Sequence, residues 1–215
     1  MPERNGKFIT FEGPEGSGKT TQIALLAKFL SKKGLAIVTT REPGGEKVAE
    51  KIRRLLLSPA SNLEPLAELF LYAASRLQHV EKIIRPALAR GAIVLCDRFS
   101  DATMAYQGYG RGISKKWIKQ INKIATAGLK PDLTIVLDLE PGLGLKRVRR
   151  LKKRADRIDR LEREALSFHT RVRQGYLALA QEEPRRIKVV KVTTVKETQA
   201  KIRELVSHQN LLCQA

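Results

Sequence analysis

The sequence predicts an α/β fold in which helices flank a parallel β-sheet of five strands. Short apolar runs rich in Ile, Val and Leu recur along the 215 residues, each about as long as one strand. Longer stretches with helical spacing separate them, and this alternation is typical of parallel sheets covered by helices. The five runs are "FITFE" (8–12), "LAIVTT" (35–40), "AIVLCD" (92–97), "LTIVLDL" (133–139) and "IKVVKV" (187–192).

The segments between these runs supply the helices. Thr20 to Lys33 and Leu66 to Ala89 have helical spacing, and "SPASNLEP" (58–65) has the composition of a loop between helices. We find no internal repeat, low-complexity block or Pro/Gly-rich linker. The sequence therefore predicts a single domain over residues 1–215, a length that can bury a substantial core.

The loops that follow the first three predicted strands, 13–19, 41–45 and 97–101, form the candidate site. Crossovers between parallel strands are right-handed, so the carboxyl ends of the strands lie at one edge of the sheet. Open α/β sheets bind their ligands at that edge. We therefore expect these three loops to lie close together.

The composition is that of a globular protein with a strong positive charge. Hydrophobic residues make up 42% and charged residues 29% of the chain, which argues against disorder. Lys and Arg number 41 against 22 Asp and Glu, and the net charge of +19 favours polyanionic ligands: nucleotides, nucleic acids or acidic membranes. Only 5% of residues are aromatic and no Cys/His spacing suggests a zinc finger, so nucleic-acid binding is the weaker interpretation.

The two cysteines, Cys96 and Cys213, provide no disulfide framework and indicate a reducing compartment. The first residues lack the long apolar segment of a signal peptide, and no apolar run approaches the ~20 residues of a membrane helix. These features predict a cytoplasmic location without membrane attachment.

The clearest chemical motif is "GPEGSGKT" (13–20), which fits G-x-x-x-x-G-K-[ST] between a strand and a helix. Its glycines let consecutive backbone N–H groups point at phosphate oxygens. Lys19 can reach the β- and γ-phosphates, and Thr20 can hold Mg²⁺ through its hydroxyl. Together with the α/β alternation, the motif predicts the P-loop NTPase fold.

Two further features narrow the kind of nucleotide protein. A GTPase would need the guanine-reading pattern N-K-x-D, and the only Asn-Lys pair, Asn122-Lys123, lacks the Asp. Glu15 places a carboxylate inside a loop built for anions. A carboxylate there is poorly suited to face the donor phosphates, and it serves better as an acceptor toward a second substrate.

Motifs along nearly the whole chain resemble those of bacterial thymidylate kinases, a family of P-loop nucleoside monophosphate kinases. The resemblance implies Mg²⁺- and ATP-dependent phosphorylation of dTMP to dTDP, in dTTP biosynthesis, by a homodimer packed through helices. The motifs are "FEGPEGSGKTTQ" (11–22), "TREPGGE" (40–46), "EKIRRLLL" (50–57), "YAASRLQHV" (72–80), "CDRFSDATMAYQGYGRG" (96–112), "GLKPDLTIVLDL" (128–139) and "DRLERE" (159–164).

The resemblance also implies a mobile lid at about 147–161, inside the basic run "KRVRRLKKRADRIDR" (146–160). Eukaryotic relatives carry an Arg at the position of Gly16, so here a lid arginine must supply that cation. Arg154 is the first choice for the transition-state contact, followed by Arg150 and Arg157, while a solvated helix face accounts for most other charges of the run. The residues expected to bind ATP are Gly13, Pro14, Glu15, Gly16, Ser17, Gly18, Lys19, Thr20, Thr21, Arg150 and Arg154.

Asp97 and Arg98 end a buried strand beside the P-loop. Asp97 is expected to bind the metal through water, together with Thr20. The resemblance implies that Arg98 bridges the dTMP phosphate and the transferring group, for which its planar fork suits phosphate better than a lysine would. The alternative is a salt bridge that caps the strand end. The expected catalytic residues are Glu15, Lys19, Arg98 and Arg154.

Matches to the family's motifs imply a dTMP site. Arg53 would grip its phosphate, Glu15 its 3′-hydroxyl, and Tyr106 would pack beside C2′, where it leaves little room for a ribose 2′-OH. Tyr72 would stack on the base, although the family usually has Phe there and a core aromatic is the alternative. The residues expected to bind dTMP are Glu15, Glu42, Arg53, Tyr72, Arg76, Arg98, Thr103, Tyr106 and Gln107.

Within this set, Arg76 would read a thymine carbonyl, and Thr103 and Gln107 the edge of the base. Glu42 is expected to orient the sugar or a metal-bound water. The three histidines are isolated in the sequence and are expected on the surface or in helix packing. They are His79, His169 and His208.

Two alternatives remain. Another P-loop kinase would act on a different mononucleotide or on a deoxynucleoside, and a panel of substrates separates it. A basic, ATP-gated nucleic-acid-binding protein would show binding to DNA or RNA that falls steeply with salt.

Overall fold

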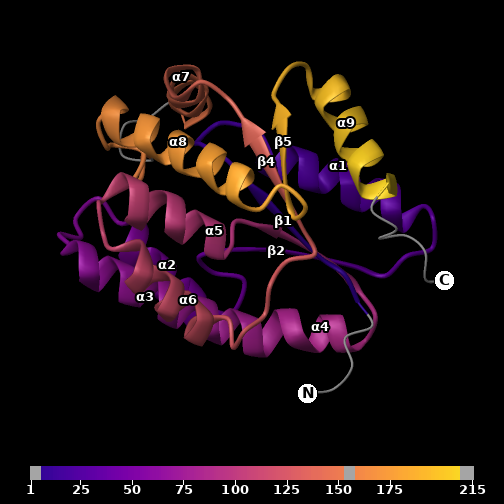
Figure 1. The fold of residues 1–215 in the computed structure, drawn as a ribbon, viewed down its shortest axis with the longest axis horizontal. Helices are drawn as coiled ribbons and strands as arrows, with labels where there is room; N and C mark the ends of the chain where they lie inside the picture. The colour runs from indigo at the N-terminus through magenta and orange to yellow at the C-terminus, as the bar shows by residue number, and fades with distance from the viewer. Residues whose placement is uncertain (1–5, 153–157, 209–215) are drawn as a thin grey trace.

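A parallel five-stranded sheet forms the centre of this computed structural model, which describes residues 6–152 and 158–208 (Figure 1). The strands are β1 (Phe8–Glu12), β2 (Ile37–Arg41), β3 (Ile93–Asp97), β4 (Leu133–Asp138) and β5 (Ile187–Lys191). Their order across the sheet is β2-β3-β1-β4-β5, and all neighbouring pairs are parallel. The predicted α/β fold with five parallel strands is confirmed.

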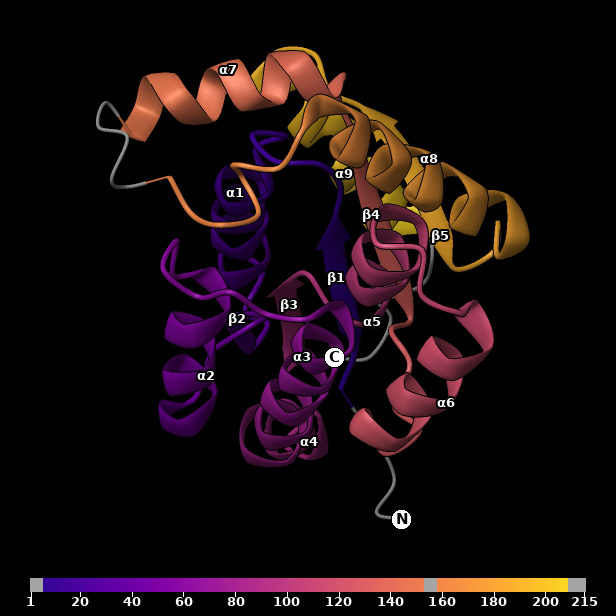
Figure 2. The same ribbon diagram turned by 90° about the vertical axis from the view of Figure 1, so that its left-hand side faces the viewer.

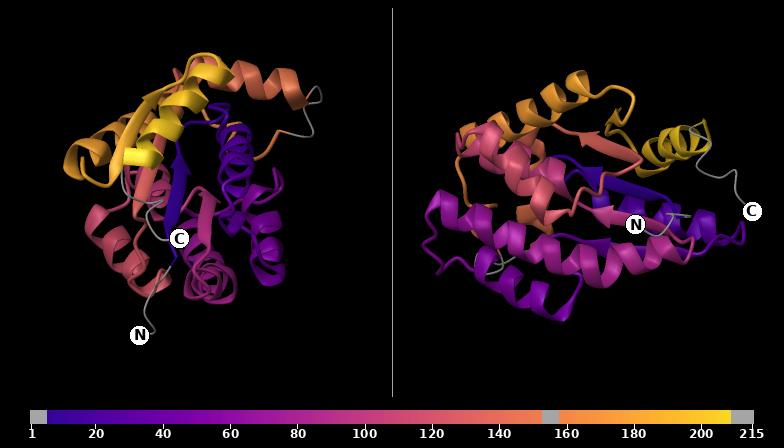
Figure 3. Two further views of the ribbon diagram at one scale, coloured as in Figure 1. Left: turned by 90° about the vertical axis from the view of Figure 1, so that its right-hand side faces the viewer. Right: turned by 60° about the horizontal axis from the view of Figure 1, so that its bottom comes forward.

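Helices cover both faces of the sheet. They are α1 (Lys19–Ser31), α2 (Lys47–Leu57), α3 (Pro65–His79), the π-helix η1 (Val80–Ile84), α4 (Arg85–Ala89), α5 (Ser100–Thr103), the π-helix η2 (Met104–Gly110), α6 (Lys115–Ala125), α7 (Pro141–Lys152), α8 (Leu166–Glu182) and α9 (Val195–His208). α1 and α9 lie side by side on one face (Figure 3). The run formed by α3, η1 and α4 packs on the other.

Strand β1 lies in the middle of the sheet and is buried on both faces. Ile9 and Phe11 pack into the cluster that α1 and α9 cover, whereas Phe8 packs with Val80 and Ile84 of η1 on the opposite face. All five residues of β1 are buried. Burial on both faces explains the apolar character of Phe8, Ile9 and Phe11, and it also buries the polar side chains of Thr10 and Glu12.

The helical run predicted from Leu66 to Ala89 is helical throughout, but η1 divides it. Pro86 lies just after this wide turn, in α4. A proline within a helix offers no N–H and its ring crowds the preceding turn, and π-turns are a common way for a helix to accommodate such an irregularity. The basic run is also helical in part, because α7 carries it to Lys152 with most of its Lys and Arg side chains exposed.

The carboxyl ends of β1, β2 and β3 meet at one edge of the sheet, as expected (Figure 2). The pairing Phe11↔Asp97 joins β1 to β3, and Arg41↔Asp97 joins β2 to β3. The loops that follow therefore start next to one another. In the described ranges, no helix combines the length and the apolar character needed to cross a bilayer.

Candidate active site

The P-loop connects β1 to α1 and has a conformation that requires glycine. Gly13 and Gly16 have φ values of 128° and 68°, and a Cβ on either would clash with a backbone carbonyl, of Leu137 and Gly144 respectively. Lys19 begins α1, and its Nζ donates to the carbonyl oxygens of Gly13 (3.3 Å) and Pro14 (3.1 Å). The ammonium therefore lies over the loop, where it can meet an anion that the loop holds.

Thr20 and Asp97 meet at the mouth of this loop. The Thr20 hydroxyl donates to Oδ2 of Asp97 across 2.9 Å. A hydroxyl and a carboxylate are hard oxygen donors, the type that Mg²⁺ prefers, and Mg²⁺ usually keeps several waters while binding only one or two protein groups. The pair therefore fits the predicted Mg²⁺ site. Elsewhere in the described residues, no group of three or more His, Cys, Asp or Glu side chains could hold a metal.

Arg98 connects the P-loop with the cavity beside it. Its Nη1 donates to the Gly13 carbonyl (3.1 Å) and to the Tyr176 hydroxyl (3.0 Å), while Nη2 lies 2.7 Å from Oε1 of Glu15. Its backbone is in the left-handed region, with φ of 71°. Such conformations cost free energy in a non-glycine residue and occur preferentially at functional sites. The alternative of a salt bridge between Asp97 and Arg98 is not seen: the carboxylate that pairs with Arg98 is Glu15.

Glu15 is held in its charged form. Burial alone would raise the pKa of its carboxyl, but the charges of Arg98 and Lys19 outweigh burial and hold the pKa at about 2. The Tyr106 hydroxyl donates to the same Oε1 at 2.7 Å. The carboxylate thus balances the positive charge of Arg98 and holds its guanidinium in position inside an anion site.

A second carboxylate, Glu12, lies behind Arg98 and was not predicted. Its Oε1 accepts from the Phe99 N–H (2.7 Å), and its Oε2 accepts from the Tyr176 hydroxyl (2.7 Å). Burial, together with the charge of Asp101, raises the pKa of Glu12 to about 7, against the lowering effect of Arg98. The only signal in the sequence was a charged residue at the end of an apolar run.

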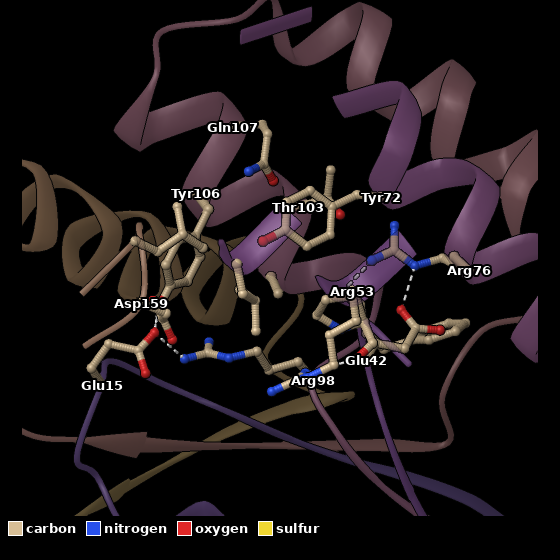
Figure 4. A pocket seen from close by; sticks show the side chains of 15 residues that line it. Glu15, Glu42, Arg53, Tyr72, Arg76, Arg98, Thr103, Tyr106, Gln107 and Asp159 are labelled. Carbon is tan, nitrogen blue, oxygen red and sulfur yellow. Dashed lines mark hydrogen bonds and ion pairs between the residues drawn. The ribbon is translucent and has the colours of Figure 1, made fainter. Parts of the chain in front are cut away.

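One cavity lies beside the P-loop, and it gathers all nine residues expected to bind dTMP (Figure 4). It encloses about 570 Å³, counting the part open to solvent, which is within the usual range for small-molecule sites. Leu57 and Leu161 add apolar surface. The lining residues are Glu15, Glu42, Pro43, Arg53, Leu57, Tyr72, Arg76, Arg98, Phe99, Ala102, Thr103, Tyr106, Gln107, Asp159 and Leu161.

The far end of the cavity is built around Arg76, which is 2% exposed. Its Nε donates to Oε2 of Glu42 (2.7 Å), its Nη1 to Asn122 (2.7 Å) and its Nη2 to the Phe99 carbonyl (3.0 Å). A buried guanidinium held at three points has a fixed orientation. Nearby, the Thr103 hydroxyl is buried and has no hydrogen-bond partner among the residues that the structure describes.

Glu42 and His79 form a buried pair at the cavity wall. Oε1 of Glu42 lies 3.0 Å from Nδ1 of His79, whose Nε2 lies 2.6 Å from the Thr40 hydroxyl. Both oxygens of Glu42 thus have protein partners, and its expected role toward the sugar or a metal-bound water stays a prediction. His79 is fully buried in α3, which agrees with helix packing and not with a surface position.

At the end of the cavity nearer the P-loop, Arg53 extends from α2 and its Nη1 donates to the Pro43 carbonyl (2.7 Å). Burial, and then the charge of Arg41, lower the pKa of its guanidinium. Arg54 is exposed, as a helix predicts for the next position. Tyr72 is 9% exposed and lines the cavity, so its ring is available both to a ligand and to the core.

The predicted lid is only partly described. Arg150 is exposed on α7, whereas Arg154 and Arg157 lie outside the described residues. After the gap, the backbone N–H of Asp159 donates to Glu162 and that of Glu162 donates to Asp159, each at 3.0 Å. These reciprocal bonds fix the segment that carries Asp159 to the cavity wall.

Other residues of the site were not predicted, because no local sequence pattern indicates their role. Tyr176 is 164 positions from its partner Glu12, and Asp159 was quoted only as part of a motif. His169 is buried in α8, which agrees with helix packing. The side chain of His208 lies outside the described residues.

Comparisons with known proteins agree with this geometry. A family model described as thymidylate kinase matches residues 11–202. The chain is 55% identical over 189 residues to a thymidylate kinase of Trichlorobacter lovleyi, covering 86% of this chain and 89% of that protein. It is 50% identical over 205 residues to that of Deinococcus radiodurans, covering 95% and 98%.

A solved structure is also similar. The crystal structure of thymidylate kinase from Ehrlichia chaffeensis matches with a TM-score of 0.78 at 35% sequence identity. The match covers 94% of this chain and 98% of that one. The likeness therefore extends over nearly the whole of both chains.

Proposed function

Since this chain belongs to the thymidylate kinase family, we propose that it phosphorylates dTMP to dTDP with ATP bound at the P-loop and dTMP in the adjoining cavity. One observation carries the assignment of the two sites. Arg98 contacts the P-loop at Gly13 and also lines the cavity. A phosphate held by the loop and a phosphate at the near end of the cavity would thus share one guanidinium.

The reaction needs little acid–base chemistry. A phosphate monoester is largely dianionic at neutral pH, since its second pKa is ~6, so the nucleophile requires no general base. The difficulty is electrostatic, because two polyanions must approach in line. Cations that lie ready around the meeting point reduce the repulsion and stabilise the transferring group.

The chain's own residues divide this task. Lys19 lies over the loop that would hold the donor phosphates, and Arg53 lies at the near end of the cavity. Arg98 lies between them. Thr20 and Asp97 would hold Mg²⁺, which would neutralise charge on the β- and γ-phosphates when bound. We propose that Arg154 would contact the transferring group. We also propose that the lid at about 147–161 belongs to a single domain spanning residues 1–215.

Preference for a deoxynucleotide would follow from Tyr106. Its ring lies against Arg98, with the guanidinium carbon 4.8 Å from the ring centre, and its hydroxyl is tied to Glu15. A ring held at both ends cannot swing away to admit a 2′-hydroxyl. This arrangement supports exclusion of ribonucleotides by steric contact.

A substrate panel tests the proposal. We expect ADP release that depends on dTMP, with lower activity toward dUMP, UMP, CMP and AMP. An enzyme that does not turn over dTMP would contradict the proposal. Efficient use of another nucleotide instead would assign the chain to a different kinase specificity. Tight DNA or RNA binding that falls with salt and responds to ATP would favour the nucleic-acid alternative.

The remaining proposals concern assembly and location. We propose a homodimer, supported by exposed apolar side chains on three neighbouring helices: Leu55 on α2, Phe70 (59% exposed) on α3 and Trp117 (54%) on α6. α3 lies between the other two (Figure 2). Light scattering on the purified protein should give twice the monomer mass of 24.1 kDa, and Phe70→Asp should give the monomer. A cytoplasmic location accords with the free thiol of the buried Cys96.

A further inference from the structure

Gln107 is hydrogen-bonded to a buried carboxylate behind the cavity wall. Its Nε2 donates to Oε1 of Glu68 across 2.7 Å. Gln107 comes from η2 and is 1% exposed, and Glu68 comes from α3 and is fully buried. Gln107 also lines the cavity (Figure 4). One end of its amide is therefore bound to Glu68, and the other end is left for a ligand.

Glu68 is surrounded by positive charge. Its Oε2 lies 3.2 Å from Nη2 of Arg111 and 2.6 Å from Nη2 of Arg160. Burial alone would raise the pKa of this carboxyl, but the bond from Gln107 and the two guanidinium groups lower it. Glu68 is therefore ionised, and an ionised carboxylate can only accept hydrogen bonds.

This chemistry fixes the orientation of the Gln107 amide. A carboxylate without a proton can bind only the N–H₂ end of the amide, so the Oε1 end must point away from Glu68. The amide thus offers the cavity an acceptor. If the neighbour were neutral, either orientation could be satisfied.

The rest of the cavity end supplies donors. A guanidinium has five N–H groups, and three nitrogens of Arg76 donate to Glu42, Asn122 and Phe99, so N–H groups on Nη1 and Nη2 remain for a ligand. The unpartnered Thr103 hydroxyl lies one turn before Gln107. Thymine and uracil present a carbonyl at C4 and a donor N3–H, whereas cytosine presents an amino group at C4 and an acceptor at N3. Only the first pattern complements Arg76 and Gln107.

We propose that Glu68 is a specificity-determining positioning residue: by holding Nε2 of Gln107, it turns Oε1 toward the base and selects pyrimidines with N3–H over those with an unprotonated N3. The inference rests on the proposed function, since it requires a pyrimidine monophosphate in this cavity. It adds a residue that does not touch the substrate.

The test compares dTMP with 5-methyl-dCMP, which have the same sugar, phosphate and methyl group and differ only at N3 and C4. Both are offered to one enzyme sample, so the ratio of their kcat/KM values does not depend on how much protein is folded. In Glu68→Gln the neighbour is neutral and the Gln107 amide can turn over. We expect the preference for dTMP to fall about tenfold, the value of one well-formed hydrogen bond.

Two further variants distinguish an effect on the orientation of the Gln107 amide from a general disturbance of the site. In the double variant Glu68→Gln with Gln107→Glu, the amide at 68 donates to a carboxylate at 107, whose other oxygen again faces the base, and the preference should return. Glu164→Gln is the matched control, because Glu164 pairs with Nη1 of Arg111 (2.6 Å) and not with Gln107. Its preference should equal that of the wild type.

The proposal is overturned by a fall of less than threefold in Glu68→Gln, by a double variant no more selective than that single variant, or by an equal fall in Glu164→Gln. Failure of the proposed function would look different, because the wild-type enzyme would then not turn over dTMP at all.

Discussion

Arg98 and Glu15 form an ion pair between the P-loop and the cavity, with 2.7 Å separating Nη2 from Oε1. The pair explains why a phosphate-binding loop carries a carboxylate. Glu15 holds the guanidinium in place and charged before the substrates arrive, and Lys19 and Tyr106 keep the carboxylate ionised in turn.

Glu15→Gln should weaken recognition of the sugar 3′-hydroxyl. The proposed contact is a hydrogen bond to a charged acceptor, worth ~1.5 kcal/mol or more, or roughly tenfold. The preference for dTMP over its 3′-deoxy analogue, measured as a ratio of kcat/KM, should fall by about that factor. An unchanged ratio would leave Glu15 with only its role beside Arg98.

Glu12→Gln should change how stability depends on pH. In the folded protein the Glu12 carboxyl has a pKa of about 7, raised from 4.5, so the folded state binds the proton more tightly than the unfolded state. The contribution of Glu12 to the free energy of unfolding is therefore largest below pH 4.5, and about 3 kcal/mol of this contribution should be lost as pH rises from 4.5 to 7.

The measurement is the unfolding midpoint at several pH values between 5 and 8. The slope across this range should be smaller in Glu12→Gln, which keeps the hydrogen-bonding shape without the charge. Glu15→Gln is the control, since a group with a pKa of about 2 does not titrate there. Parallel curves for the wild type and Glu12→Gln would contradict the assignment.

Glu42→Gln should raise the KM for dTMP while leaving the KM for ATP unchanged. The carboxylate binds Nε of Arg76 in a buried site, and loss of its charge frees the guanidinium that we assign to the base. We expect an increase of about tenfold in the KM for dTMP. As a control, Glu81→Gln removes a carboxylate from an exposed pair with Arg85 and should change neither KM. An equal effect in both variants would refute the proposed role of Glu42 in positioning Arg76.

The contrast between the sheet and this network shows what local sequence can reveal. Strands such as "IVLCD" (93–97) were predictable because burial on both faces makes a strand apolar along most of its length. The P-loop was predictable because its chemistry needs a fixed spacing. The resemblance identified nine residues for the dTMP site one by one, and all nine line the cavity.

The partners of those residues could not be predicted in the same way. Glu42 with His79, Glu68 with Gln107, and Glu12 with Tyr176 join positions that are 37, 39 and 164 residues apart. Each contact exists only because two elements pack together, and no spacing rule connects the two residues. A charged residue in an otherwise apolar segment was the only available signal, as for Glu12 and Glu68.

Asp97→Asn should raise the Mg²⁺ concentration needed for half-maximal activity. Asparagine can still accept from the Thr20 hydroxyl, but it lacks the charge that favours a divalent cation. We expect the requirement to rise roughly tenfold, with the activity partly recovered at high Mg²⁺. Asp138→Asn alters a carboxylate that also ends a strand but pairs with Arg173. Its Mg²⁺ requirement should match the wild type, and an Asp97→Asn enzyme with the same requirement would remove Asp97 from the site.

Arg154→Ala should lower kcat far more than it alters the KM for dTMP. The family resemblance implies that Gly16 replaces an Arg of eukaryotic relatives, so we propose that the lid supplies a cation to the transferring group. A supplied arginine is worth ~10³ in other phosphoryl transfers, and a loss of that order is expected here in single-turnover rates. Arg149→Ala removes an exposed charge from α7 and controls for net charge, so its kcat should stay within about twofold of the wild type. If Arg154→Ala retained the wild-type kcat while Arg150→Ala lowered it, the contact to the transferring group would belong to Arg150. That contact would then come from the last turn of α7.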